Sequence, residues 1–329
     1  MTISPLVATA AAPPLLRIRE PDSLIAAVPH LLGFTPEQSL VVVLIDDTDV
    51  VVVARYDLAQ VAAAKAAELF MGLLVQGRQH GATRAVALLY GPFLRARRVY
   101  QAVRRGLGQW LDFCLVVDLD QDCWWPGTAR PTDPGIPLKP NPSVEAWARR
   151  HDWEPVGRRD QLGDELAPPR GSQEDRLIAV WAGIAAELPA TESATTWSRY
   201  LAAPTADWSE ADFVTAAQLV HRPELRDQLW LALTTEKADD YFAFWSQAVR
   251  CTPLEHRLLP LAVVGLIAWL SGRGGLFSVC HEECLTLAAT GPVVDLLTLI
   301  RRHYVHPEMW SILKHSAQAA VDGHRILAG

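Results

Sequence analysis

The 329 residues exceed the usual size of a single hydrophobic core, and 50% of them are hydrophobic while 20% are charged, so we expect a globular protein of two domains. A net charge of −7 at pH 7 argues against general affinity for nucleic acids. The basic residues are 26 Arg and 4 Lys, a bias typical of high-GC coding, so arginine content alone is not a functional signal.

The cysteines and the apolar segments indicate a cytoplasmic protein. Five cysteines at irregular spacings do not make the even set of a secreted disulfide framework. The N-terminus has no positively charged segment before an apolar run, so no signal peptide is expected. The most apolar run, residues 258–270, is shorter than the about 20 residues that span a bilayer, so a buried core helix is expected there.

The first expected elements are a lead-in and a short helix. Residues 1–14 consist of Ala, Pro and small side chains without periodicity, which predicts disorder. Residues 23–32 predict an apolar helix that Pro29 interrupts and Gly33 ends.

Two strands are predicted next. Residues 39–45 and 50–56 are rich in β-branched side chains without alternation, which is typical of central strands buried on both faces. The sequence Asp46-Asp47-Thr48-Asp49 between them favours a turn, so the two strands are predicted to form a hairpin.

The following elements alternate between helices and strands. Helical spacing covers residues 58–79 and 93–110, and buried strands are predicted at 84–90 and 111–119, with residues 120–125 pairing back on the last strand. This alternation requires crossover connections, so we expect an α/β fold with a mixed, partly parallel sheet flanked by helices.

A proline-rich stretch follows the sheet. Residues 126–142 predict a long loop, and residues 143–151 predict a short helix. Trp124 and Trp125 precede the loop, and one of them should lie near the surface or under it, because adjacent strand residues point to opposite faces.

The second half is predicted to be all helical. Residues 158–172 are polar and contain two adjacent prolines, so we place a boundary there between an α/β domain at 15–168 and a helical domain at 173–329. The apolar spacing predicts helices at 174–188, 192–202, 209–221, 223–233, 236–250, 254–271, 276–289, 292–304 and 307–321. Short connections predict stacked antiparallel hairpins with a core separate from that of the first half.

Several segments in this order resemble an actinobacterial family, domain of unknown function family 4192. The segments are residues 28–42, Arg55-Tyr56-Asp57-Leu58, Tyr90-Gly91-Pro92, Trp124-Trp125-Pro126, Arg226-Asp227 and Ala268-Trp269-Leu270-Ser271-Gly272. The resemblance runs from about residue 21 to 310. It implies a high-GC Gram-positive setting and brings no activity and no catalytic residue.

The end of the chain is also similar to tetratricopeptide helical hairpins. Gly272 fits the turn of such a hairpin, whereas Phe277 and Cys284 stand where that repeat places small residues.

The segment 28–42 has a structural interpretation and a functional one. Gly33 ends a helix and Pro36 fixes a turn before a buried strand, so the segment can be a helix-to-strand connection that needs no ligand. Loops on rigid scaffolds also carry function, and in that case Gly33, Phe34 and Ser39 are ligand-binding candidates.

Tyr90 and Gly91 end a strand that runs into a helix, and ligands of open α/β sheets gather at such carboxyl ends. Both residues are therefore ligand-binding candidates, although glycine and proline here are also ordinary turn residues. The sequence contains no glycine-rich phosphate fingerprint, P-loop lysine or nucleophile elbow, so no catalytic residue is assigned and no cofactor is expected.

Asp118, Asp120 and Asp122 alternate at the end of a predicted strand, and carboxylates on one face are the ligands of a divalent cation. The spacing begins like a calcium loop, but Cys123 and Ala129 replace its Gly and its bidentate Glu. A solvated turn is favoured, and Asp118 and Asp120 remain ligand-binding candidates.

Cys280 and Cys284 lie four residues apart on one helical face and supply half of a zinc site. His303 and His306 are the candidates for its other half, but no sequence pattern brings them close to the two cysteines. Cysteine is among the most buried residue types, so core packing is favoured and no metal site is assigned.

Arg95, Arg98 and Arg105 share one side of the helix predicted at 93–110. They are anion-binding candidates for phosphate or an acidic partner, with a solvated helix face as the alternative.

Two functions follow from these observations. The first is a non-enzymatic binding or scaffolding protein that uses its helical half as the surface for a protein partner. The second is an enzyme or small-ligand sensor with a site at the strand ends. Nucleic-acid binding is disfavoured by the net charge, no membrane association is expected, and the sequence sets no oligomeric state.

Overall fold

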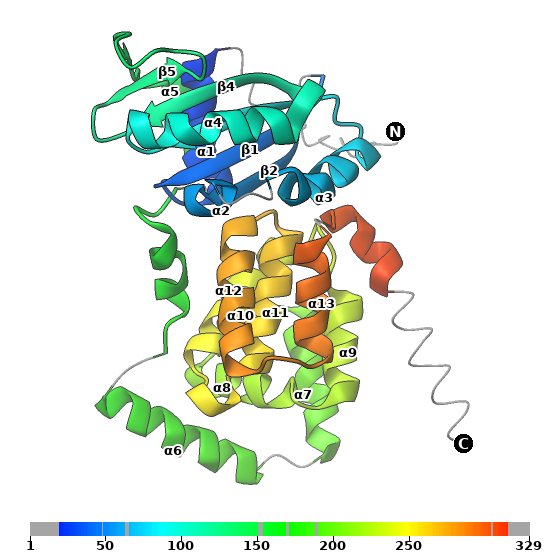
Figure 1. Cartoon of the computed structure of the whole chain (residues 1–329). Coiled ribbons are helices and arrows are strands. Elements are labelled where there is room, and N and C mark those ends of the chain that lie inside the picture. The colour runs from blue at the N-terminus through cyan, green and yellow to red at the C-terminus, as the bar shows by residue number, and fades with distance from the viewer. Residues whose placement is uncertain are drawn as a thin grey trace, which may run out of the picture.

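The computed structural model describes residues 20–47, 49–62, 66–150, 154–168, 171–187, 190–303 and 305–314. These residues form a part with a six-stranded sheet and a part built of helices, which lie at the top and the bottom of Figure 1. The disordered lead-in predicted at residues 1–14 lies outside the described residues.

The strands form one mixed sheet in the order β2-β1-β3-β4-β5-β6. Among them only β3 and β4 pair in parallel. The bounds are β1 Ser39–Asp46, β2 Asp49–Asp57, β3 Arg84–Tyr90, β4 Leu111–Asp118, β5 Cys123–Pro126 and β6 Ile136–Pro137. The predicted mixed, partly parallel sheet is confirmed, together with the hairpin of β1 and β2 and the return of β5 onto β4.

The two strands of the hairpin occupy different places in the sheet. β1 lies between β2 and β3, and residues 40–44 are buried throughout. β2 is the edge strand and its Val50 is exposed. The prediction that residues 50–56 form a central strand is therefore wrong, because β-branched residues favour any half-buried strand and do not report how many neighbours it has.

The helices of the sheet part are α1 Pro21–Leu32, α2 Leu58–Ala62, α3 Ala66–Gln79, α4 Phe93–Leu107 and α5 Pro142–Arg150, with short 3₁₀ segments η1 Gly108–Trp110 and η2 Arg159–Leu166. The helix predicted at 58–79 appears as α2 and α3, and residues 63–65 are not described. α1 continues through Pro29, contrary to the predicted interruption, because a proline removes only one helical hydrogen bond. It ends at Gly33, where φ is 81° and the N–H donates to the Pro29 carbonyl at 2.8 Å.

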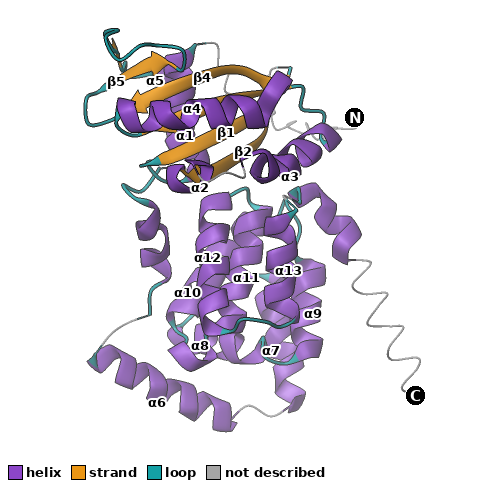
Figure 2. Cartoon of the chain, viewed as in Figure 1, coloured by secondary structure: helices purple, strands orange, loops and turns teal. Residues whose placement is uncertain are grey.

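Helices cover both faces of the sheet (Figure 2). α2, α3 and α4 bury their apolar side chains on one face, and α1 buries Leu24, Ile25 and Val28 on the other. α4 is strongly amphipathic: Phe93, Ala96 and other apolar residues at intervals of three or four face the sheet, and its arginines face away from it.

The two tryptophans of β5 point to opposite faces, as adjacent strand residues must. Trp124 joins the cluster on the α1 face, and Trp125 joins the cluster under α4. Trp125 Nε1 donates to the Asp133 carbonyl at 3.1 Å, so this tryptophan lies under the proline-rich stretch as predicted. That stretch is not wholly a loop, because β6 pairs with β5 inside it.

The second part is helical throughout its described residues, which confirms the helical spacing found from residue 174. Its elements are α6 Ser172–Glu187, α7 Ala190–Ala202, α8 Glu210–Leu219, α9 Pro223–Ala232, α10 Ala238–Arg250, η3 Leu254–His256, α11 Leu258–Leu270, α12 Gly274–Leu287, α13 Pro292–Arg302 and η4 Pro307–Met309. No strand occurs in the described residues from 171 onward.

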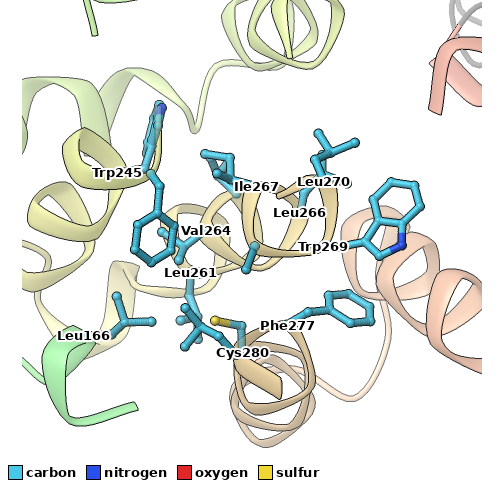
Figure 3. Close-up of a cluster of buried hydrophobic side chains, with 14 of the residues drawn as sticks. Leu166, Trp245, Leu261, Val264, Leu266, Ile267, Trp269, Leu270, Phe277 and Cys280 are labelled. Atoms are coloured by element: carbon cyan, nitrogen blue, oxygen red, sulfur yellow. The ribbon is translucent and has the colours of Figure 1, made fainter. Parts of the chain in front are cut away.

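α11 is the centre of this part (Figure 3). Its residues 260–270 are all buried, as expected for the most apolar run of the chain, and Pro260 is tolerated because it lies in the first turn. α12 returns antiparallel after a turn at Gly272, where φ is 77°. Within the described residues, no helix is both long enough and apolar enough to cross a bilayer.

The buried apolar side chains of the two parts are continuous. Val41 and Tyr90 on the α1 face of the sheet belong to the same cluster of buried side chains as Leu261 and Trp245 of the helical part. Leu166 of η2 is also in this cluster and lies near Leu261 in Figure 3. The prediction of two separate cores is therefore wrong, because an apolar stripe reports which face is buried and not which element covers it. The boundary drawn between residues 168 and 173 stays a prediction.

Candidate functional site

The carboxyl ends of β3 and β4 meet the beginning of β1 at one end of the sheet, which we call the strand-end edge. Ser39 pairs with Tyr90 across β1 and β3, and the Gly91 N–H donates to the Val117 carbonyl at 2.9 Å. Asp118 ends β4 beside them. The structure thus brings together four of the predicted ligand-binding candidates, Ser39, Tyr90, Gly91 and Asp118.

Side chains of the protein itself pack into the strand-end edge. The Gln38 amide lies against Gly91, so that a Cβ at Gly91 would be 3.1 Å from Gln38 Nε2. Gln38 has a φ of 45°, a left-handed conformation that is uncommon for residues other than glycine. Ser39 Oγ accepts a hydrogen bond from Arg55 Nε at 2.8 Å and donates one to the Glu37 carbonyl at 2.6 Å.

Two buried polar atoms of this edge have no hydrogen-bond partner among the described residues, Tyr90 Oη and Gln38 Oε1. Burial raises the pKa of Tyr90 far above its ordinary value, so the hydroxyl keeps its proton and can both donate and accept. A buried polar group without a hydrogen-bond partner destabilises the folded protein. A ligand or ordered water that bonds to these two atoms would therefore gain binding free energy at this edge. The sequence carries no functional signal for Gln38 apart from its place in segment 28–42.

Gly33 and Phe34, the other candidates of that segment, lie where the two parts of the protein meet. Val156 pairs with them in a short parallel bridge: its N–H donates to the Gly33 carbonyl at 3.0 Å. Phe34 is only 2% exposed and packs toward Gly275 at the start of α12. We call this contact, formed by Leu32, Phe34, Leu162 and Gly275, the seam.

Gly275 shows how closely the two parts approach at the seam. A Cβ there would lie 2.3 Å from the Leu32 carbonyl oxygen and 3.1 Å from Leu162 Cδ1. Real Cβ atoms do not come so close to a backbone atom, so this position requires glycine. The segment 28–42 therefore connects α1 to β1 and also forms half of the contact with the helical part.

A buried arginine fastens η2 beside the seam. Arg257 is 1% exposed; its Nε donates to Glu283 Oε1 at 2.8 Å, its Nη1 to the Val249 carbonyl at 3.0 Å, and its Nη2 to the Leu166 carbonyl. A buried charge persists only when paired and hydrogen-bonded, and here every guanidinium nitrogen has a partner. The one sequence signal was a charged residue directly before the apolar run of α11.

A second polar network joins η2 to α12 and α13. Arg159 Nη2 contacts both carboxylate oxygens of Glu282 at 2.9 Å, and Arg301 Nη2 contacts Oε1 at 2.7 Å. Burial alone would raise the pKa of Glu282, but the hydrogen bonds from Arg301 and Arg159 lower it below its ordinary value. Arg301 Nη1 also lies 3.1 Å from His281 Nδ1, and His281 Nε2 lies 2.8 Å from Thr298 Oγ1.

These contacts assign the protonation of His281. A guanidinium only donates, so Nδ1 of His281 accepts from Arg301 and Nε2 carries the proton that it donates to Thr298 Oγ1. Burial and the Arg301 charge both lower the pKa of His281, which keeps the ring neutral. In a Ser-His-Asp site the histidine instead accepts from the hydroxyl, so this pair is not arranged to activate Thr298 as a nucleophile.

The three aspartates after β4 form a turn. Asp118 is buried and its Oδ1 accepts from the Gln121 N–H at 3.3 Å, whereas Asp120 is exposed. Asp122 has a φ of 52°, which asparagine and aspartate tolerate in turns. Within the described residues, no group of three His, Cys, Asp or Glu side chains is placed to hold a metal ion.

Both cysteines of α12 face the core. Cys280 and Cys284 are fully buried, and Cys280 packs where α12 crosses α11, so that a Cβ at Gly265 would lie 3.1 Å from Cys280 Cβ. Burial raises the pKa of Cys280 well above its ordinary value and that of Cys284 to about 12. Both thiols are therefore protonated at neutral pH and are poor nucleophiles.

The predicted anion-binding residues lie together on the outer face of α4. Arg95, Arg98 and Arg105 are all exposed, while Arg97 is partly buried and donates from Nε to the Ala129 carbonyl at 3.1 Å. These arginines are on the opposite side of the sheet from α1 and share no residue with the seam.

Comparison with known proteins gives one match. No curated protein and no solved structure matched the chain. A family model, described as a domain of unknown function (DUF4192), matches residues 21–308, which include the strand-end edge, the seam and α4. Because that match covers most of the 329 residues, the chain belongs to the DUF4192 family.

Proposed function

We propose that this protein is a non-enzymatic binding or scaffolding protein of the bacterial cytoplasm whose helical part provides the surface for a protein partner. The observation that carries the proposal is that the chemically reactive side chains near the seam are engaged in structural contacts. Arg257 is bonded on every nitrogen, His281 is held neutral by Arg301, and both thiols of α12 are buried. Arg257 joins η2 to the helical part, and the other groups pack inside that part, so all of them serve the fold. A rigid framework of this kind is what a scaffold requires.

The partner surface that we propose lies where the end of the described chain packs on α9. Trp310 Nε1 donates to the Leu233 carbonyl at 3.0 Å, and Lys314 Nζ donates to the Leu231 carbonyl at 3.3 Å. Two large apolar side chains beside these contacts remain open to solvent, Leu231 with 41% and Ile312 with 57% exposure. We infer that these two side chains belong to one apolar patch, the kind of surface feature that marks protein interaction sites.

The tetratricopeptide-like character of the last helices belongs to the same proposal. α11 and α12 form an antiparallel hairpin with Gly272 at the turn, and the small residue at their crossing is Gly265. Such hairpins stack into surfaces that bind extended partners.

Affinity capture tests the proposal. We expect the wild-type chain to retain one protein in stoichiometric amount from a native lysate, and the variant Leu231→Ser/Ile312→Ser to lose it. The control Leu285→Ser/Leu299→Ser changes two exposed leucines elsewhere on the helical part and should retain the partner. Repeated captures without a partner, or equal retention by both variants, would contradict the proposal.

A second candidate function, a small-ligand sensor at the strand-end edge, is favoured by the unpartnered Tyr90 Oη and Gln38 Oε1. A ligand that bonds these atoms would stabilise the folded state and raise the unfolding temperature. A panel of metabolites and metal ions, screened by thermal shift, should contain a stabiliser whose effect is lost in Tyr90→Phe. A panel without any stabiliser, or one whose effect survives this substitution, argues for the scaffold alone.

A further inference from the structure

α4 carries charge of one sign only. Its sequence, FLRARRVYQAVRRGL, contains five arginines and no acidic residue. The whole chain carries −7, so once these five positive charges are set aside the remainder carries −12. A helix this basic on an otherwise acidic protein is not explained by the arginine-rich composition, because that bias applies equally to the rest of the chain.

The exposed arginines of α4 have no acidic partner among the residues that the structure describes. Arg95, Arg98, Arg104 and Arg105 form no ion pair with any of these, whereas some other surface arginines, such as Arg84, Arg176 and Arg273, do pair with carboxylates. Arg97, the fifth, stacks on the Tyr100 ring at 4.9 Å and bonds the Ala129 carbonyl.

The outer face of α4 is also partly apolar. Leu94, Arg98 and Arg105 follow one another at intervals of four and seven residues, so they form one stripe along the helix, about 16 Å long at 1.5 Å per residue. Leu94 at its start is 61% exposed. The neighbouring α3 packs beside α4 on the same face of the sheet and exposes Met71 at 61% and Val75 at 50%. Arginines and bare apolar side chains thus occupy one outer layer, which we call the α4 face.

We propose that the α4 face docks an acidic, amphipathic segment of a protein partner. Carboxylates of that segment pair with Arg98 and Arg105, each of which offers a planar fork of donors suited to a carboxylate. Its apolar side chains cover Leu94 and the exposed residues of α3. This surface is separate from the one proposed on the helical part, so either can fail without the other.

The same features disfavour a nucleic acid as the occupant. Single-stranded nucleic acids gain much of their affinity by stacking bases on aromatic side chains, and no aromatic side chain is exposed among the described residues of α3 and α4. A long polyanion would also extend beyond the α4 face onto a protein whose other residues carry a net charge of −12. A short acidic segment contacts only the basic stripe.

Fluorescence anisotropy of the full-length chain tests the proposal. The probe is a labelled peptide of about 12 residues that repeats Glu-Leu-Glu-Glu, long enough as a helix to cover the stripe. At low salt, about 50 mM, we expect saturable binding that Arg98→Glu/Arg105→Glu weakens by at least about tenfold, and that falls steeply as salt is added. A second peptide with Ser in place of each Leu should bind more weakly at equal charge.

A matched variant removes the effect of net charge. Arg149→Glu/Arg150→Glu makes the same change of charge on α5, where both arginines are exposed on the α1 side of the sheet. It should bind the peptide within about twofold of wild type. Equal weakening in both variants, equal binding of the Ser peptide, or no binding by wild type would overturn the proposal. So would tighter binding of a single-stranded oligonucleotide of equal charge, or of vesicles rich in phosphatidylserine, to the same arginines.

Discussion

The arginines beside the seam and those of the α4 face are used in opposite ways. Beside the seam, Arg257 is buried, and Arg159 and Arg301 share the carboxylate of Glu282. On the α4 face, Arg98 and Arg105 are exposed and face no carboxylate of the described chain. Arginine enrichment in a sequence is therefore not one signal: where the fold supplies an acid, arginine holds structure together, and where it does not, arginine stays exposed to solvent, where only a cluster such as that of α4 adds up to a basic stripe.

The largest effect is expected at Arg257. Arg257→Met keeps the apolar volume but leaves the buried Leu166 carbonyl without its donor and removes the ion pair of Glu283, which is 33% exposed, while the Val249 carbonyl keeps the Thr252 N–H. Loss of these bonds and of the packed guanidinium should cost about 3 kcal/mol, which urea unfolding measures directly. Arg302→Met, an exposed arginine at the end of α13, should change stability by less than about 0.5 kcal/mol. Equal effects of the two substitutions would remove the contrast on which the comparison rests.

A substitution at the seam tests how closely the two parts are packed there. Gly275→Ala places a Cβ 2.3 Å from the Leu32 carbonyl, so the two parts must move apart, at a cost of about 1–3 kcal/mol. Gly274→Ala is the matched control, because a Cβ there meets nothing within 4 Å. The control should be neutral or slightly stabilising, since alanine favours helix more than glycine does. An unfolding free energy unchanged by Gly275→Ala would show that the seam is loose.

Gly275 also shows which features of the fold the sequence can predict and which it cannot. The strands, the crossover helices and the helical second part follow from local spacing, because burial of one face leaves a period in the sequence. Gly275 leaves none, since its requirement comes from Leu32, far away in the chain. The edge position of β2 and the continuity of the core were missed for the same reason.

The candidate site divides in the same way. The residues at the strand ends could be predicted, whereas the convergence of Ser39, Tyr90, Gly91 and Asp118 depends on the strand order β1-β3-β4, which the sequence does not give. The role of Gln38 could not be predicted either, because it depends on a left-handed φ and on packing against Gly91.

A smaller effect is expected from pH, through His281. Burial and the Arg301 charge lower the pKa of His281 in the folded protein. Below the ordinary histidine pKa of about 6.5, His281 is therefore protonated in the unfolded chain but still neutral in the folded protein. Stability that is present above this pH is lost as the pH falls toward the lowered pKa. Urea unfolding at pH 7.5 and 5.5, about one unit to either side, should show lower stability in acid, and His281→Gln should reduce that difference.

Two other histidines, His306 and His221, act in the same direction, because burial lowers the pKa of each. Burial and His80 lower the pKa of His306, whose ring lies 4.6 Å from that of His80, so some pH dependence will remain in the His281 variant. Substitution of the exposed His303 by Gln serves as the control and should leave the slope unchanged. A protein more stable at the lower pH would contradict the assignment of His281 as a neutral donor to Thr298.

The smallest effect on stability is expected on the α4 face, and its smallness is informative. Arg98→Ala/Arg105→Ala removes two exposed side chains without ion pairs and inserts the best helix former, so unfolding should shift by less than about 0.5 kcal/mol in either direction. The same variant should lose most of its affinity for the acidic peptide. Residues that matter for stability and residues that matter for binding would then separate by region, the seam on one side and α4 on the other. If instead this variant loses more than about 1 kcal/mol of stability, Arg98 and Arg105 support the fold as the arginines beside the seam do. Their charges would then already be paired within the protein and could not bind a partner.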